Sequence, residues 1–128
     1  MEYSFVHGIR TKPEKGLLGI CPLCGGEVLA KCGDMKIHHW VHKNLEDCDT
    51  WGEGETPWHR DWKNSLPEEF RERPFVDDIS GERHRADVYT SLGITIEFQN
   101  SPINSNERSA RIHLRLQIEA LKHRCIIF

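Results

Sequence analysis

The chain has 128 residues, of which 38% are hydrophobic and 29% are charged, and its net charge is −3. This length suits one domain, or one domain with a small appended module. The high charged fraction, without a long apolar run, excludes a membrane-spanning helix. Because residues 1–16 lack an apolar stretch of signal-peptide length, we expect a cytoplasmic protein.

Charge is distributed unevenly along the chain. The net charge is +2 over residues 1–43, −8 over residues 44–103 and +3 over residues 104–128. An acidic middle between basic ends suits a divalent-cation site flanked by surfaces that hold an anionic polymer. The alternative is ordinary variation of surface charge.

A Cys/His-rich block in residues 21–43 follows one or two short strands predicted within residues 1–18. Five cysteines, an odd number, in a chain without a recognisable secretion signal argue against a disulfide framework and favour metal binding. Cys21 and Cys24 have Cys-x-x-Cys spacing, and Gly25 and Gly26 supply the turn that such a pair needs.

Three downstream histidines can complete this site. Two cysteines with two histidines close a tetrahedral zinc site, which is structural because no coordination position stays open. His39-x-x-His42 and His38-x-x-x-His42 are both sterically possible pairs, and Cys32 and Cys48 are further candidate ligands. The alternative is a pair of free thiols beside surface histidines.

A helix is predicted from Thr56 to about Asn64, because Thr56 can cap it and Pro57 suits its first turn. Trp58 and Trp62 share one face at i, i+4 spacing and are expected to pack in the core. A second line of the same spacing consists of Glu55, His59 and Lys63.

Residues 70–80 can hold a strand, and residues 86–90 and 94–98 form a predicted hairpin. A three-residue loop centred on Leu92 pairs Val88 with Ile96 and Asp87 with Glu97. Directly opposed side chains have β-carbons roughly 4.5–5.5 Å apart, and like charges there are destabilising. The two carboxylates therefore need a reason to face each other.

A divalent cation between Asp87 and Glu97 is the simplest reason, because carboxylate oxygens with waters form a magnesium site. Gln99 points into the same space and can orient a water or a phosphate oxygen. The alternative is a solvent-exposed face on which the acids pair with Arg83 or Arg85.

The last segment is predicted to be a helix capped by Asn104 or Ser105 and followed by a short apolar strand near the C-terminus. Four basic residues on one side of this helix can contact a phosphate backbone in a sequence-independent way. The alternative is a solvated helix face. These residues are Arg108, Arg111, Arg115 and Lys122.

Three segments in this order, CPLCGGEV…KIHHWVHK, WGEGETPWHRDWKN and HRADVYT…GITIEFQNSPI, resemble the competence protein CoiA-like family. The resemblance covers roughly residues 15–110. It implies a zinc-finger-like segment followed by a nuclease domain of the PD-(D/E)XK type. The implied chain is α+β (α/β), with an N-terminal zinc-binding finger or ribbon module in residues 1–48 and a restriction-endonuclease-like αβββαβ core in residues 49–128.

The resemblance also implies roles for individual residues. Asp87 in RADV and Glu97 in IEFQ match the two metal-binding acids, and Glu55 in GETPWH matches the acid on the first helix. Gln99 stands where the superfamily most often has a lysine that helps to activate water. The zinc ligands implied by the resemblance are Cys21, Cys24, His39 and His42.

Residues and resemblance together predict a metal-dependent nuclease with structural Zn²⁺ and catalytic Mg²⁺ or Mn²⁺. Gln99 would position the attacking water, and His59 would contact the phosphate or assist the leaving group. The expected partner is nucleic acid, with DNA as the substrate, in competence, recombination or phage DNA processing. The alternative is a non-catalytic, zinc-stabilised protein with a degenerate nuclease site that binds nucleic acid or a protein partner.

Overall fold

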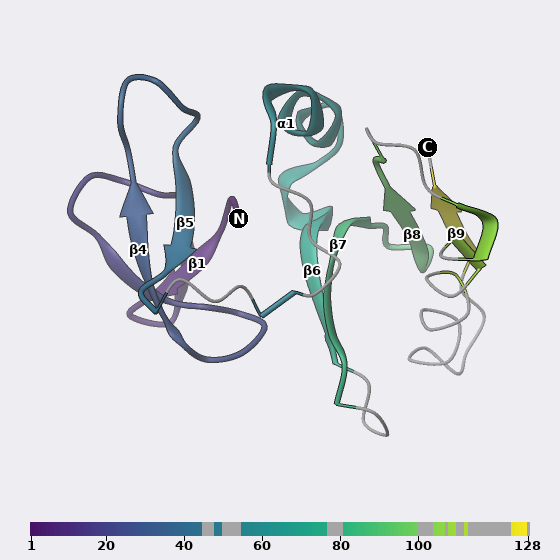
Figure 1. Ribbon diagram of the computed structural model, residues 1–128, viewed down its shortest axis with the longest axis horizontal. Coiled ribbons are helices and arrows are strands. Elements are labelled where there is room, and N and C mark those ends of the chain that lie inside the picture. Colours follow the sequence, from purple (N-terminus) through teal and green to yellow (C-terminus); the bar gives the residue numbers. More distant parts are fainter. Residues whose placement is uncertain are drawn as a thin grey trace.

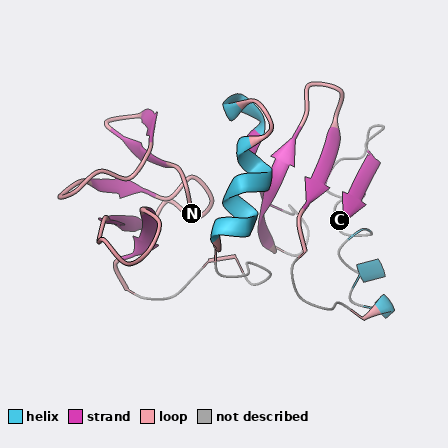
Figure 2. Ribbon diagram, turned by 90° about the horizontal axis from the view of Figure 1, so that it is seen from above, coloured by secondary structure: helices cyan, strands magenta, loops and turns pink. Residues whose placement is uncertain are grey.

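The computed structural model contains two β-sheets, and one α-helix lies between them (Figures 1 and 2). No described helix is long and apolar enough to cross a membrane. The structure describes residues 1–44, 48–49, 55–76, 81–99, 104–106, 108–109, 112 and 124–127.

The first sheet has the strand order β2-β1-β3-β4-β5, and all its pairs are antiparallel. Its small core consists of Cys21, Leu23, Val28 and Trp40, so the cysteine-containing turn is part of the core. The strands are β1 (Ser4–Val6), β2 (Ile9–Thr11), β3 (Leu18–Ile20), β4 (Glu27–Lys31) and β5 (His39–His42).

The second sheet has the strand order β6-β7-β8-β9, in which only the β8–β9 pair is parallel. A parallel pair needs a long crossover connection, and the predicted C-terminal helix lies in that connection. Residues 105–106, 108–109 and 112 are helical there, and most of the predicted helix lies outside the described residues. The elements are α1 (Pro57–Asn64), a 3₁₀ turn (Glu68–Phe70), β6 (Arg71–Val76), β7 (Arg83–Tyr89), β8 (Ile94–Glu97) and β9 (Arg124–Ile127). The predicted mixed α+β class is confirmed.

Helix α1 begins as predicted but buries a different face. The hydroxyl of Thr56 accepts a hydrogen bond from the His59 amide, which caps the helix. The expected core packing of the tryptophans is wrong, because Trp58 and Trp62 are 38% and 50% exposed. Instead His59 and Lys63 are buried, at 7% and 2% exposure. The sheet face beneath this line is acidic, so the polar side of the helix has the complementary chemistry.

The predicted hairpin has the predicted register. Val88 pairs with Ile96, and the amide of Thr90 donates a 2.9 Å hydrogen bond to the carbonyl oxygen of Ile94. Gly93 supplies the positive φ of 73° that the short loop needs. Ala86 and Val88 are fully buried on the predicted apolar side of the strand. The opposite side therefore carries Asp87.

Candidate functional site

A cluster of sulfur and nitrogen ligands lies beside the cysteine turn of the first sheet. It consists of Cys21, Cys24, His42 and Cys48, whose ligand atoms all lie within 4.8 Å of one another. The sulfur atoms of Cys21 and Cys48 are 3.7 Å apart, and Cys24 Sγ is 3.3 Å from His42 Nε2. Two ligands of a tetrahedral zinc ion lie roughly 3.6–3.8 Å apart. The cluster can therefore bind a metal ion.

The turn around the first two cysteines is built to present their sulfur atoms. The amide of Leu23 donates to Cys21 Sγ at 3.4 Å, and the amide of Gly26 donates to Cys24 Sγ at 3.3 Å. Gly25 has a φ of 73°, a conformation that favours glycine. A β-carbon at Gly26 would lie 3.2 Å from Cys24 Sγ, so a side chain there would press on the ligand.

One predicted ligand lies outside this cluster. Cys48 joins the cluster in place of His39, which the resemblance had implied. His39 and His42 are three positions apart on β5, and side chains that far apart on a strand point to opposite faces. The ring Nδ1 of His39 instead donates to the carbonyl oxygen of Ile37 at 2.8 Å.

The chemistry of the cluster favours a bound cation. Burial and the neighbouring Cys21 sulfur raise the pKa of Cys48. Burial also opposes ionisation of Cys24, but the Gly26 amide and the adjacent thiols outweigh it and lower the pKa of Cys24. A divalent cation would remove the mutual repulsion of these thiolates. Three thiolates with one imidazole form a donor set that suits zinc.

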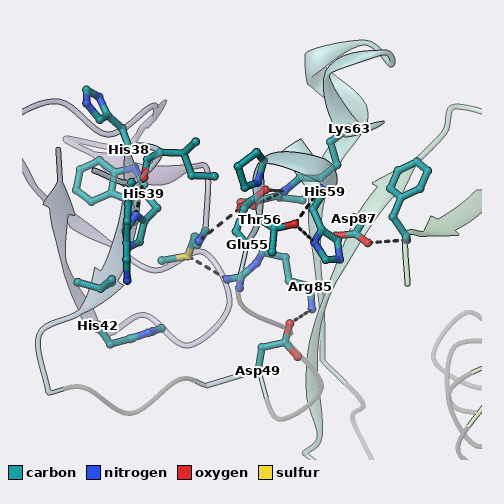
Figure 3. Close-up of a pocket in the computed structure, with 18 of the residues that line it drawn as sticks. His38, His39, His42, Asp49, Glu55, Thr56, His59, Lys63, Arg85 and Asp87 are labelled. Atoms are coloured by element: carbon teal, nitrogen blue, oxygen red, sulfur yellow. Dashed lines mark hydrogen bonds and ion pairs between the residues drawn. The ribbon is translucent and has the colours of Figure 1, made fainter. Parts of the chain in front are cut away.

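Acidic side chains form a row across the second sheet. The register of β6 with β7 places Glu72 opposite Asp87, and that of β7 with β8 places Asp87 opposite Glu97. These positions line a cleft of 1040 Å³, together with Gln99 and His59. The first sheet forms the other wall of this cleft (Figure 3).

Asp87 is the acid in this row whose ionisation is disfavoured. Burial, and next the charge of Glu97, raise the pKa of Asp87 to about 7. Lys63 and the amide of Phe98, which donates to Asp87 Oδ2 at 2.8 Å, oppose this rise without cancelling it. A cation bound beside this carboxyl group would stabilise its ionised form and so lower its pKa.

We expect Asp87→Asn to stabilise the zinc-loaded protein at pH 8 when no other divalent metal is added. The folded pKa of Asp87 lies above its unfolded value, so its ionisation lowers the free energy of unfolding as pH rises from about 4 to about 7. The variant escapes this cost, which is at most roughly 4 kcal/mol for three pKa units. Thermal unfolding should show a gain at pH 8 that shrinks towards pH 4. A variant that is less stable than wild type at pH 8 would contradict the assignment.

A second group of carboxylates is already neutralised by a lysine. The Nζ atom of Lys63 is 2.6 Å from Glu55, 3.0 Å from Glu72 and 3.9 Å from Glu2. Burial lowers the pKa of Lys63, but Glu72 and Glu55 outweigh burial and raise it. The three carboxylates lie close enough together to hold a metal ion. Because the ammonium sits among them, we interpret the group as an ion-paired anchor between the two sheets.

Glu72 shows how this anchor is built. It has a φ of 51° within β6, a left-handed conformation that is uncommon for residues other than glycine. Its carboxylate accepts hydrogen bonds from the amides of Glu2 at 2.8 Å and Tyr3 at 3.2 Å. Glu72 therefore lies opposite Asp87 in the register of the sheet, but its carboxylate binds Lys63 and the amides just before β1 of the first sheet.

A buried histidine contacts the other end of the row. His84 Nε2 is 3.3 Å from Glu97 Oε1, and His84 Nδ1 is 3.0 Å from Asp49 Oδ1. Burial raises the pKa of Asp49, but the hydrogen bond and charge of His84 outweigh it and lower that pKa. The motif HRAD in β7 contains this histidine, yet nothing local indicates that Asp49 is its partner.

The structure brings all five predicted catalytic residues to one cleft. Asp87, Glu97, Gln99, His59 and Glu55 all line it. His59 Nδ1 lies 2.8 Å from the Thr56 hydroxyl, and Glu55 pairs with Lys63 and Arg60. Arg108 is exposed in a helical segment, whereas Arg111, Arg115 and Lys122 lie outside the described residues.

Comparisons with known proteins match the segment that forms the Cys/His cluster. Residues 19–50 match the family described as "Competence protein CoiA, N-terminal domain". The chain is also 39% identical over 46 residues to Competence protein CoiA of Bacillus subtilis (strain 168). This match spans 36% of the chain and 12% of the length of that relative. No solved structure matches the chain. All four cluster residues lie within the family match, so the segment that carries the Cys/His cluster is similar to the N-terminal domain of competence protein CoiA.

Proposed function

We propose that the chain is a metal-dependent phosphodiester hydrolase, a nuclease that acts on DNA, in which the Cys/His cluster holds structural Zn²⁺. The observation that carries this proposal is the pair of opposed acids, Asp87 and Glu97, in a cleft where the pKa of Asp87 is raised to about 7. The order of one helix, three antiparallel strands, a helical segment and a parallel strand supports a restriction-endonuclease-like core.

Asp87 and Glu97 would hold Mg²⁺ or Mn²⁺, which supplies an acidified water and a polarised phosphate when bound. The amide of Gln99 orients the attacking water in the same cleft. Gln99 itself is neutral, but a positive charge is close by, since Lys63 acts on Asp87 enough to oppose its raised pKa. His59, which the Thr56 hydroxyl holds in the cleft, contacts the phosphate.

The test is cleavage of supercoiled plasmid and of labelled single strands in Mn²⁺ by the zinc-loaded protein. Asp87→Asn and Glu97→Gln should each lower the rate on the order of 10³-fold, because the metal supplies several kcal/mol of transition-state stabilisation. Asp61→Asn is the matched control, since it removes an acid from the exposed side of α1. Zinc content and thermal unfolding of each variant establish that the fold is retained.

Two results would contradict the nuclease proposal: a wild type that cuts neither substrate, or acid variants that cut as fast as wild type. Retention of DNA without cleavage would then favour the non-catalytic binding protein. Gln99 is neutral, whereas related nucleases most often have a lysine at this position that helps to activate water. This difference favours the non-catalytic binding protein as the second candidate function. The name of the Bacillus subtilis relative supports a role in competence for either function.

A further inference from the structure

Glu97 contacts the buried side chain of His84, which in turn contacts Asp49, and the proposed mechanism uses neither of these two residues. His84 Nε2 is 3.3 Å from Glu97 Oε1, and His84 Nδ1 is 3.0 Å from Asp49 Oδ1. The side chains of His84 and Asp49 are only 4% and 2% exposed, and that of Glu97 is 13% exposed. One oxygen of the candidate metal ligand therefore packs against an imidazole that is closed off from solvent.

Asp49 is itself fixed from a second direction. Its Oδ2 accepts a hydrogen bond from the amide of Arg85 at 3.0 Å (Figure 3), and its Oδ1 contacts His84, so both carboxylate oxygens have partners on β7. With Asp49 held in place, the imidazole of His84 is oriented through Nδ1, and its Nε2 is directed at Glu97. The contact between Asp49 and His84 joins residues 35 positions apart.

The position of Asp49 is also tied to the Cys/His cluster. It directly follows Cys48, whose sulfur is 3.7 Å from that of Cys21. A metal ion in the cluster would fix Cys48 and would therefore restrict where Asp49 can lie. Asp49 thus connects the Cys/His cluster, through its neighbour Cys48, to His84 and Arg85 on β7 of the second sheet.

We infer that Asp49 and His84 are positioning residues that orient Glu97 for binding the catalytic metal. The inference rests on the proposed function in taking Glu97 as a metal ligand. Hydrogen-bond partners that orient metal ligands are typically worth about 10–100-fold in metal affinity. Here the Asp49 carboxylate contacts Nδ1 of His84, and Nε2 of the same ring contacts the Glu97 carboxylate, the candidate metal ligand.

The test is Mn²⁺ affinity of the zinc-loaded protein, measured from the electron paramagnetic resonance signal of free Mn²⁺. His84→Ala should weaken binding about 10–100-fold, and Asp49→Asn should weaken it in the same direction. His84→Gln should recover much of the loss, because its amide can donate to Glu97. A merely structural role for His84 would not produce this rescue. His7→Asn is the matched control, since His7 is exposed and lies in the turn between β1 and β2.

The first two of the following outcomes separate this inference from the nuclease proposal. Mn²⁺ binding by His84→Ala and Asp49→Asn at wild-type affinity would overturn the positioning role, whether or not the protein cleaves DNA. Weakened binding in both variants, in a wild type that binds Mn²⁺ but cuts nothing, would support the positioning role and contradict the nuclease. A wild type that does not bind Mn²⁺ would overturn both.

Discussion

Cys48→Ser is expected to abolish tight zinc binding, whereas His39→Ala is expected to retain it. Cys48 Sγ belongs to the cluster with Cys21, while His39 lies on the opposite face of β5 from the candidate ligand His42. A structural zinc site contributes on the order of 10 kcal/mol to the folding of a small module. The first sheet has only a small core, so loss of the metal should unfold it.

Zinc content by mass spectrometry, with competition against a colorimetric chelator, measures this pair of variants directly. Wild type and His39→Ala should each carry one tightly held zinc ion per chain, and Cys48→Ser should release it to the chelator. The reverse result, with zinc lost from His39→Ala and kept by Cys48→Ser, would restore the ligand set implied by the family resemblance.

Lys63→Met is expected to lower the free energy of unfolding by about 3–5 kcal/mol, the usual effect of breaking a buried ion pair from one side. The side chain of Lys63 is 3% exposed and contacts Glu55 and Glu72 at 2.6 and 3.0 Å. Methionine keeps the packing of the stem but leaves these carboxylates without their shared cation. Adding Glu72→Gln should recover part of the loss, because it removes one of the stranded charges.

Urea unfolding of the zinc-loaded protein measures this effect, and the chain offers a matched control. Lys43 and Glu27 form an ion pair of the same 3.0 Å length, but their side chains are 54% and 66% exposed. Lys43→Met should cost no more than about 1 kcal/mol, because water and salt screen an exposed pair. Equal losses in the two variants would show that Lys63 is not held as a buried counter-ion.

Local chemistry was enough to predict several elements and their detail. Thr56 and Pro57 predicted the start of α1, because a cap and a first-turn proline act within one turn of helix. The short loop around Leu92 predicted the pairing of Val88 with Ile96, because loop length sets hairpin register. The same register predicted that Asp87 and Glu97 would face each other.

Contacts between distant segments could not be predicted in this way. Spacing alone favoured histidines near Cys21 and left Cys48 as a spare, since the path of the chain after β5 is not a local property. The tryptophans of α1 were expected inside because hydrophobic side chains usually are. That rule failed because the sheet beneath the helix is acidic.

The amino-acid sequence by itself determines the helix cap, the cysteine turn and the opposed acids, because each depends on interactions between residues that are close in the chain. Only the tertiary structure decides which ligand completes the cluster, which face of α1 is buried and which histidine contacts Glu97. Those outcomes depend on contacts such as Glu2 with Glu72, 70 positions apart, and Asp49 with His84, 35 positions apart. A buried charge is stable only beside an opposite charge, and the tertiary fold determines which residue supplies it. The periodicity of one segment does not indicate which residue of another segment will be its partner.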